Sequence, residues 1–167
     1  MSIAGNKGKI LYGLGGLAVA VIAWAAFRPE LVFVNQKVHE SLPVAGIPGS
    51  KDAPVILASG KFHGVSHETK GTATIYQLAA NKQVLRLADF STSNGPDVHV
   101  YLIAAKDAMD NSTVKSSPFL ELGMLKGNQG DQNYDLPATA DLTKYRAAVI
   151  YCERFHAIFG LAKLDKF

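Results

Sequence analysis

Eighteen consecutive residues without a charge, Ile10–Phe27, constrain what this chain can fold into more than any other feature. About 20 apolar residues are needed to cross the hydrocarbon core of a bilayer as a helix, so the run is just long enough to span it. Gly13, Gly15 and Gly16 fit this interpretation, because glycine is common in membrane helices. No face of the segment is polar, which argues against a helix packed on a soluble core. The sequence therefore predicts a transmembrane helix over residues 10–27.

Charges around this segment indicate its orientation. Lys7 and Lys9 precede the run, whereas Arg28 after it is accompanied by Glu30. This bias favours residues 1–9 in the cytoplasm and a C-terminal domain that is periplasmic or extracellular. A cleaved signal peptide is the alternative, because Ala23-Trp24-Ala25 has the small residues of a cleavage site. Both alternatives place the rest of the chain in the same compartment.

Residues 28–54 are expected to connect the anchor to a folded domain. Leu31, Val34, Val38 and Leu42 recur at spacings of three and four, which predicts an amphipathic juxtamembrane helix. A short strand is the alternative. Residues 43–54 contain three prolines and two glycines, so we expect a linker there.

Residues 55–167 have the pattern of an all-β domain. In Val98–Leu102, apolar residues alternate with His99 and Tyr101, as expected for a strand with one buried face. Turn-rich segments separate such runs, and no long helix pattern intervenes. We predict an antiparallel β-sandwich or a partly closed Greek-key barrel. The expected strands cover residues 55–62, 72–78, 83–87, 98–104, 147–152 and 157–164.

Composition excludes several classes of function. The net charge is +3 and the basic residues form no stripe with interleaved aromatic residues, so no nucleic-acid partner is expected. One cysteine, Cys152, rules out an internal disulfide and a zinc site built on several cysteines. Lys126–Asp131 contains glycines but lacks the ending of a phosphate loop.

Cys152 is the most reactive residue type in the sequence, and two roles are open for it. On strand parity it shares a face with Ala148 and Ile150, and a free cysteine often packs as a small inert hydrophobe. Arg154 follows two positions later, on the same face if the strand continues. A nearby cation favours the thiolate that reacts or binds metal.

Histidines supply a second set of candidates. His63 and His67 are four positions apart and would lie on one side of a helix or strand, as two metal ligands could. Surface loop histidines are the competing interpretation. His67-Glu68 does not complete a metalloprotease signature, because position 71 is glycine. No nucleophile–base pair is supported by spacing, so an enzyme is the less favoured class.

From about Val55 to its end, the chain resembles the DM13 domain, an extracytoplasmic all-β module proposed to act in electron transfer. The resemblance rests on four blocks in the family's order: Gly60-Lys61-Phe62 with His67 and Gly71-Thr72-Ala73; Leu85–Leu87 with Asp89-Phe90 and Asn94–Leu102; Leu125–Asn128 with Gly130–Tyr134 and Leu136-Pro137; and Val149–Phe155 with Phe159–Ala162.

This resemblance implies a role for the cysteine. The family's cysteine maps onto Cys152, where it is proposed to act as a bare thiol or as a ligand to haem or a metal. His67, Asp97 and His156 are candidate ligands or neighbours. Tyr151 replaces an expected tryptophan, and His156 an expected asparagine. The resemblance thus predicts a redox module with a redox partner protein, and a non-redox ligand- or protein-binding module is the alternative.

Overall fold

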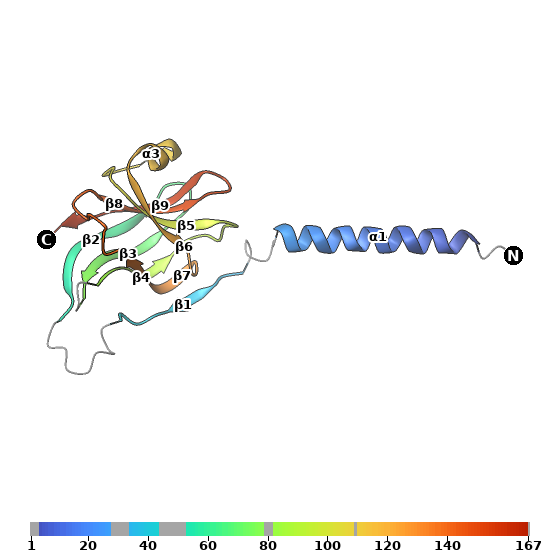
Figure 1. Cartoon of the computed structure of the whole chain (residues 1–167), viewed down its shortest axis with the longest axis horizontal. Helices are drawn as coiled ribbons and strands as arrows, with labels where there is room; N and C mark the ends of the chain where they lie inside the picture. Colours follow the sequence, from blue (N-terminus) through green and yellow to red (C-terminus); the bar gives the residue numbers. More distant parts are fainter. Residues whose placement is uncertain (1–3, 28–33, 44–52, 79–81, 109, 167) are drawn as a thin grey trace.

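The computed structural model describes residues 4–27, 34–43, 53–78, 82–108 and 110–166. Helix α1 (Ala4–Phe27) extends away from a β-structured domain (Figure 1). Its described side chains, those of residues 12–24, are all exposed, and no other atoms lie within 4 Å of a Cβ placed on its three central glycines. Within the described residues, no helix is both long enough and apolar enough to span a membrane.

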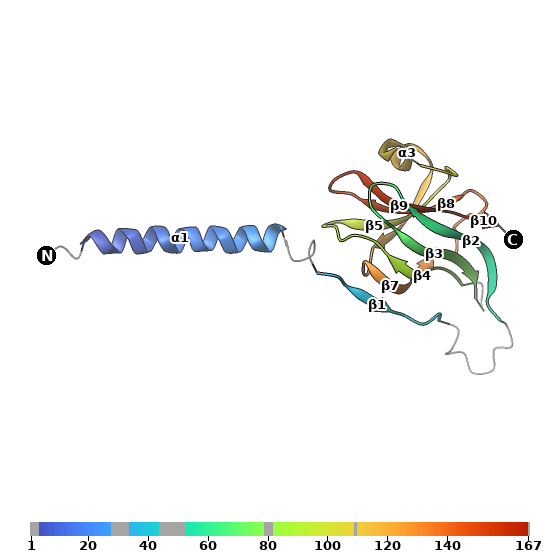
Figure 2. The same ribbon diagram turned by 180° about the vertical axis from the view of Figure 1, so that it is seen from behind.

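In the part of the chain that the structure describes, ten strands form the domain, and all their pairings are antiparallel except that of β1 with β7. Their spatial order is β1-β7-β4-β3-β2-β9-β8-β5-β6, with β10 also paired to β2 (Figures 1 and 2). A short helix, α3 (Asn111–Ser116), joins β5 to β6. The strands are β1 (Lys37–His39), β2 (Val55–Gly64), β3 (Lys70–Gln77), β4 (Gln83–Ser91), β5 (Val98–Ile103), β6 (Phe119–Met124), β7 (Gln129–Leu136), β8 (Ala147–Cys152), β9 (Ala157–Lys163) and β10 (Asp165–Lys166).

Strand β2 makes the sheet curl into two layers. Its first part pairs with β3 and β10, and its last three residues pair with β9 in the other layer. At Gly60, between these parts, a Cβ atom would lie 1.8 Å from the backbone oxygen of Lys163. The opposite ends of the sheet also meet, because β6 contacts β7. The all-β, partly closed architecture predicted from the sequence is therefore confirmed.

Strand alternation divides β5 and β8 between two cores. Val98, Val100 and Leu102 face the main core between the layers, as the sequence predicts. Tyr101 and Ile103 face a smaller outer cluster, which also contains Val114 of α3. Figure 2 shows α3 lying above the β8–β9–β5 layer, on its outer side. One sheet layer therefore presents buried residues to both of its faces.

The helix expected after the anchor is not present in the part of it that the structure describes. Residues 37–39 form β1, which pairs parallel with β7, and residues 28–33 lie outside the described residues. Glu40 secures this strand, because its carboxylate accepts hydrogen bonds from Lys126 and from the backbone of Asn133. The spacing of the apolar side chains predicted a helix in this segment. The backbone of residues 37–39 instead forms hydrogen bonds with the open edge of β7. The expected linker at 43–54 lies mostly outside the described residues.

Strands β6, β7 and β10 were not predicted from the sequence, and a strand at β1 was only the alternative to a helix. Strand β7 lacks the expected apolar alternation, since its inward residues include Gln132. The Gln132 side chain is fully buried, yet it pairs with the backbone of Gly127 and with the Tyr134 hydroxyl. Buried polar groups are tolerated when paired in this way. Strand β6 is an edge strand with only half-buried or exposed residues, so its pattern is weak.

Candidate functional site

Cys152 lies at the end of β8 and faces the main core. Its side chain is fully buried, on the same face as Ala148 and Ile150, as strand parity predicts. Val98 of β5 and Ala157 of β9 lie directly opposite it on either side. Among the described residues, no hydrogen bond reaches its sulfur atom, and the thiol forms no disulfide. The sulfur is therefore sealed among apolar groups.

Arg154 does not share this face. Strand β8 ends at Cys152, and residues 153–156 form a turn in which Arg154 is exposed. The expectation that a continuing strand would place the Arg154 guanidinium beside the thiol is wrong. The backbone of Glu153 donates a hydrogen bond to the Asp97 carbonyl, one position beyond the last β5–β8 pair, and the chain then reverses in the turn.

A small pocket of about 370 Å³ opens near the cysteine end of the core. The half-buried ring of His67 forms one wall and packs on Phe159, with 4.1 Å between ring centroids. Phe155, 66% exposed, lies at the rim. The remaining lining comes from Ala157 and from Asn94, Gly95 and Pro96. Ala157 is the β9 partner of Cys152, so the pocket lining includes a direct strand neighbour of the cysteine.

His63 and His67 do not form a pair. His63 lies opposite Leu161, which belongs to the outer cluster, whereas His67 packs on Phe159 of the main core. Strand β2 ends at Gly64, so the spacing of four does not continue on one strand. The two histidines therefore lie on opposite sides of the layer.

Asp97 and His99 belong to a charged network on the outer side of β5. The His99 Nε2 atom lies 3.0 Å from an Asp97 carboxylate oxygen, and its Nδ1 atom lies 2.7 Å from a Glu121 carboxylate oxygen. Each ring nitrogen thus has a carboxylate partner. The Asp97 side chain therefore pairs with the His99 imidazole, whereas the resemblance suggested it as a ligand or neighbour of Cys152.

Tyr101 continues this network into the protein. Its side chain is buried, and its hydroxyl donates a short hydrogen bond to the carboxylate of Glu153. The Lys115 ammonium of α3 lies 2.5 Å from the same carboxylate oxygen and 3.2 Å from the hydroxyl. Burial and then the bond to Glu153 raise the pKa of Tyr101 far above its ordinary value. Burial opposes ionisation of Glu153, but hydrogen bonds from Lys115 and Tyr101 outweigh it and lower the pKa of that carboxyl.

His156 occupies a special backbone position. It has φ of +50° in the turn between β8 and β9, a region that asparagine adopts more readily than most residues. The family's usual asparagine therefore suits this turn. The His156 ring is exposed, and its Nδ1 atom lies 3.5 Å from the Tyr151 hydroxyl, on the side of the layer opposite the cysteine sulfur.

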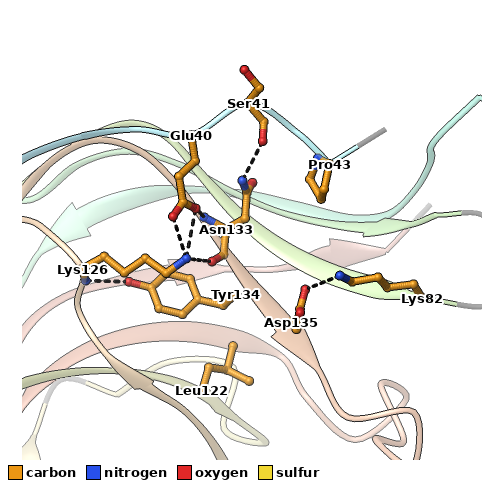
Figure 3. Close-up of a pocket in the computed structure, with 9 residues that line it drawn as sticks. All are labelled: Glu40, Ser41, Pro43, Lys82, Leu122, Lys126, Asn133, Tyr134 and Asp135. Carbon is orange, nitrogen blue, oxygen red and sulfur yellow. Dashed lines mark hydrogen bonds and ion pairs between the residues drawn. The ribbon is translucent and has the colours of Figure 1, made fainter. Parts of the chain in front are cut away.

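A second, more polar pocket lies where the β1 segment meets β7 (Figure 3). Its volume is about 600 Å³. Figure 3 shows that its charged groups are already paired: Lys126 contacts Glu40, and Lys82 contacts Asp135. The Asn133 amide also donates to the Ser41 carbonyl. The contacts of Glu40 and Ser41 hold the β1 segment on the sheet edge, so this pocket has a structural role.

The described residues do not fit a metal or haem centre at Cys152. No group of three or more histidine, cysteine, aspartate or glutamate side chains is placed to hold a metal ion in this part of the chain. The cysteine sulfur has no exposed surface from which to ligate an iron. His67 lines the pocket, whereas Cys152 does not. The side chains around Cys152 therefore fit a bare thiol better than a metal or haem ligand.

Sequence reasoning missed most of the outer network. His99, Tyr101, Lys115, Glu121, Tyr151 and Glu153 were not among the candidate site residues. One signal was available, because the alternation Val98–Leu102 places His99 and Tyr101 together on the face opposite the apolar residues. Lys115 and Glu121 carry no comparable signal, since only the fold brings α3 and β6 to β5.

Comparison with known proteins identifies one family. Residues 61–164 match the family model described as electron transfer DM13. No curated protein and no solved structure matches the chain. The match covers more than half of the chain, from β2 to the residue after β9, and includes Cys152 and the whole outer network. The chain belongs to the electron transfer DM13 family.

Proposed function

We propose that this chain is an electron-transfer module held at a membrane, outside the cytoplasm, with Cys152 as its redox residue. The family match over residues 61–164 is the observation that carries the electron-transfer part. The position of Cys152 supports its role: the cysteine pairs directly with Ala157, which lines the pocket near His67. A thiol in this place is protected from water and from stray oxidants.

Access to the thiol would come through the turn at residues 153–156. This turn carries the pocket residue Phe155 at its exposed rim and leads directly into Ala157. Movement of this turn, which directly follows Cys152, is the proposed route by which the sulfur becomes accessible. A partner that binds over Phe155 would then reach Cys152, which couples partner binding to redox exchange.

The Cys152→Ala variant of the full chain is expected to lose redox exchange with its native membranes while keeping its fold. In the wild type, alkylation of the thiol should be slow in the folded protein and fast after denaturation, since burial governs access. The measurement is mass-spectrometric alkylation kinetics, together with electron uptake by the chain in its own membranes.

Two variants control this experiment. The His156→Asn variant changes an exposed residue in the same turn and should leave alkylation and electron uptake unchanged. The Phe155→Ala variant should accelerate alkylation by removing the rim of the pocket. Electron uptake that is the same in Cys152→Ala and in the wild type would refute the role of the thiol.

Membrane attachment is proposed to depend on residues 10–27. The absence of charge in this segment and the exposure of the described side chains of α1 support it. A chain that begins at residue 28 is expected to be released from membranes by alkaline carbonate, whereas the full chain is retained. If the mature protein instead begins near Ala25 by mass spectrometry, the segment is a cleaved signal peptide.

A non-redox binding module is the second candidate, and the exposed ring of Phe155 favours it. An exposed aromatic side chain beside an apolar pocket is typical of a contact surface. This candidate predicts that Phe155→Ala abolishes partner binding, whereas Cys152→Ala has no effect on any activity. The pair of variants therefore separates the two functions.

A further inference from the structure

The outer network contains a buried tyrosine with a built-in proton acceptor. The Tyr101 hydroxyl donates to the Glu153 carboxylate, and the Lys115 ammonium contacts both groups. The other titratable groups near Tyr101 are Glu121 of β6, His99 of β5 and Tyr151 of β8. No part of this network contacts the cysteine sulfur, which faces the opposite side of the layer.

We propose that Tyr101 is a second redox residue of this domain, which gives up an electron and a proton together. This inference rests on the proposed electron-transfer function and deepens it. The oxidant is a one-electron acceptor held by the partner protein, of the haem or metal-centre class. The electron passes to that acceptor, the O–H bond of Tyr101 breaks, and the proton forms an O–H bond on Glu153. The product is a neutral tyrosyl radical beside a protonated carboxyl group.

The hydrogen bond makes this step favourable in a way that burial alone does not. Oxidation of a tyrosine whose proton has nowhere to go leaves a radical cation, and an apolar interior disfavours that charge. Glu153 removes the charge from the ring, since a tyrosine radical cation is a far stronger acid than a carboxylic acid. Reduction reverses the sequence, because the proton returns from Glu153 as the electron arrives.

Two edge-on aromatic contacts connect Tyr101 to its surroundings. Its ring packs edge-on against Phe119, at 5.5 Å between centroids, and against Tyr151, at 6.0 Å. Phe119 is half exposed, and Tyr151 leads through its hydroxyl to the exposed ring of His156. Tyr101 therefore lies one side-chain layer below the surface, within electron-transfer range of a docked partner.

Tyr134 is an internal control for Tyr101, because it is a buried tyrosine with a different hydrogen-bond acceptor. It is also buried, but its hydroxyl donates to the Gln132 amide oxygen at 2.8 Å and accepts from the Lys126 backbone. An amide oxygen is a much weaker base than a carboxylate and does not take up the proton. The two tyrosines are thus similar in burial and differ in the proton acceptor.

The test is one-electron oxidation of the full chain in detergent by photogenerated ruthenium(III) tris-bipyridine, followed by freezing and electron paramagnetic resonance. All proteins carry Tyr12→Phe, because Tyr12 is highly exposed on α1 and would oxidise on its own. We expect a tyrosyl radical whose yield falls about tenfold in Tyr101→Phe and in Glu153→Gln, because loss of a charge-assisted acceptor removes the driving force. Tyr134→Phe should keep the wild-type yield.

The outcomes separate this inference from the proposed function. A radical yield in Tyr101→Phe or Glu153→Gln equal to that of the wild type overturns the inference, as does an equal fall in Tyr134→Phe. Thermal unfolding of each variant shows whether a fall in yield comes from lost structure. Cys152→Ala should retain the radical. If it also retains electron uptake in membranes, the role of the thiol fails while that of Tyr101 stands. If the radical is absent and uptake still requires Cys152, the reverse holds.

Discussion

The Gly60→Ala variant is expected to lose about 3 kcal/mol of unfolding free energy, the upper part of the range for overpacking a protein interior. The added Cβ atom would lie 1.8 Å from the backbone oxygen of Lys163 and 2.7 Å from the carbonyl carbon. A backbone group cannot rotate away as a flexible side chain can. Strand β2 or the end of β9 must therefore shift, close to the point where β2 passes between the two layers. Urea unfolding followed by circular dichroism measures the loss.

The Gly123→Ala variant is the matched control. Gly123 has a positive φ of 106°, but no atom lies within 4 Å of its added Cβ. Its cost is the backbone strain alone, about 1 kcal/mol or slightly more. A Gly60→Ala variant as stable as Gly123→Ala would show that the close approach of β2 and β9 can relax, and that the junction between the layers is not rigid.

The Cys152→Asp variant is expected to lose roughly 3 kcal/mol or more, because a carboxyl group would be placed among apolar side chains without a partner. Cys152 has no exposed surface and belongs to the main core. Arg154 is exposed in the turn and does not supply a compensating charge. The expected observation is a shift of the urea midpoint far below that of the wild type.

Cys152→Ala keeps the apolar character of the site and controls for the loss of volume. Its expected cost is about 1 kcal/mol, typical of a small deletion in a core. Similar stability of the aspartate and alanine variants would mean that water or a cation reaches position 152. That result would also remove the argument that the thiol is shielded until a partner binds.

Contacts among the candidate functional residues are of two kinds: some join residues of the same strand, and others join residues far apart in the sequence. His99 and Tyr101 share the outer face of β5 by simple alternation, so their proximity follows from the chain itself. Lys115 and Glu153 reach the Tyr101 hydroxyl from α3 and from the turn after β8, 14 and 52 positions away. No local pattern predicts such contacts. The proton acceptor of Tyr101 was therefore invisible before the fold was known.

Two predicted residue pairs, Arg154 with Cys152 and His63 with His67, are wrong for a related reason. Pairing Arg154 with Cys152 assumed that the strand continued, but the chain turns at Glu153 to begin the reversal into β9. Pairing His63 with His67 likewise assumed one regular element, and β2 ends between them. A prediction based on residue spacing is valid only when both residues belong to the same regular helix or strand.

By itself, the sequence determined the all-β class, six of the strands and the face of β8 on which Cys152 lies, because alternation is a local property of the chain. Tertiary structure decided the rest. Strand β7 buries a glutamine whose partners lie in the preceding turn, and β1 is a strand because an open edge of β7 pairs with its backbone. It also decided that the cysteine is sealed and that Tyr101, on the other side of the layer, has a carboxylate partner. These properties depend on groups distant in sequence, and only the folded chain brings them together.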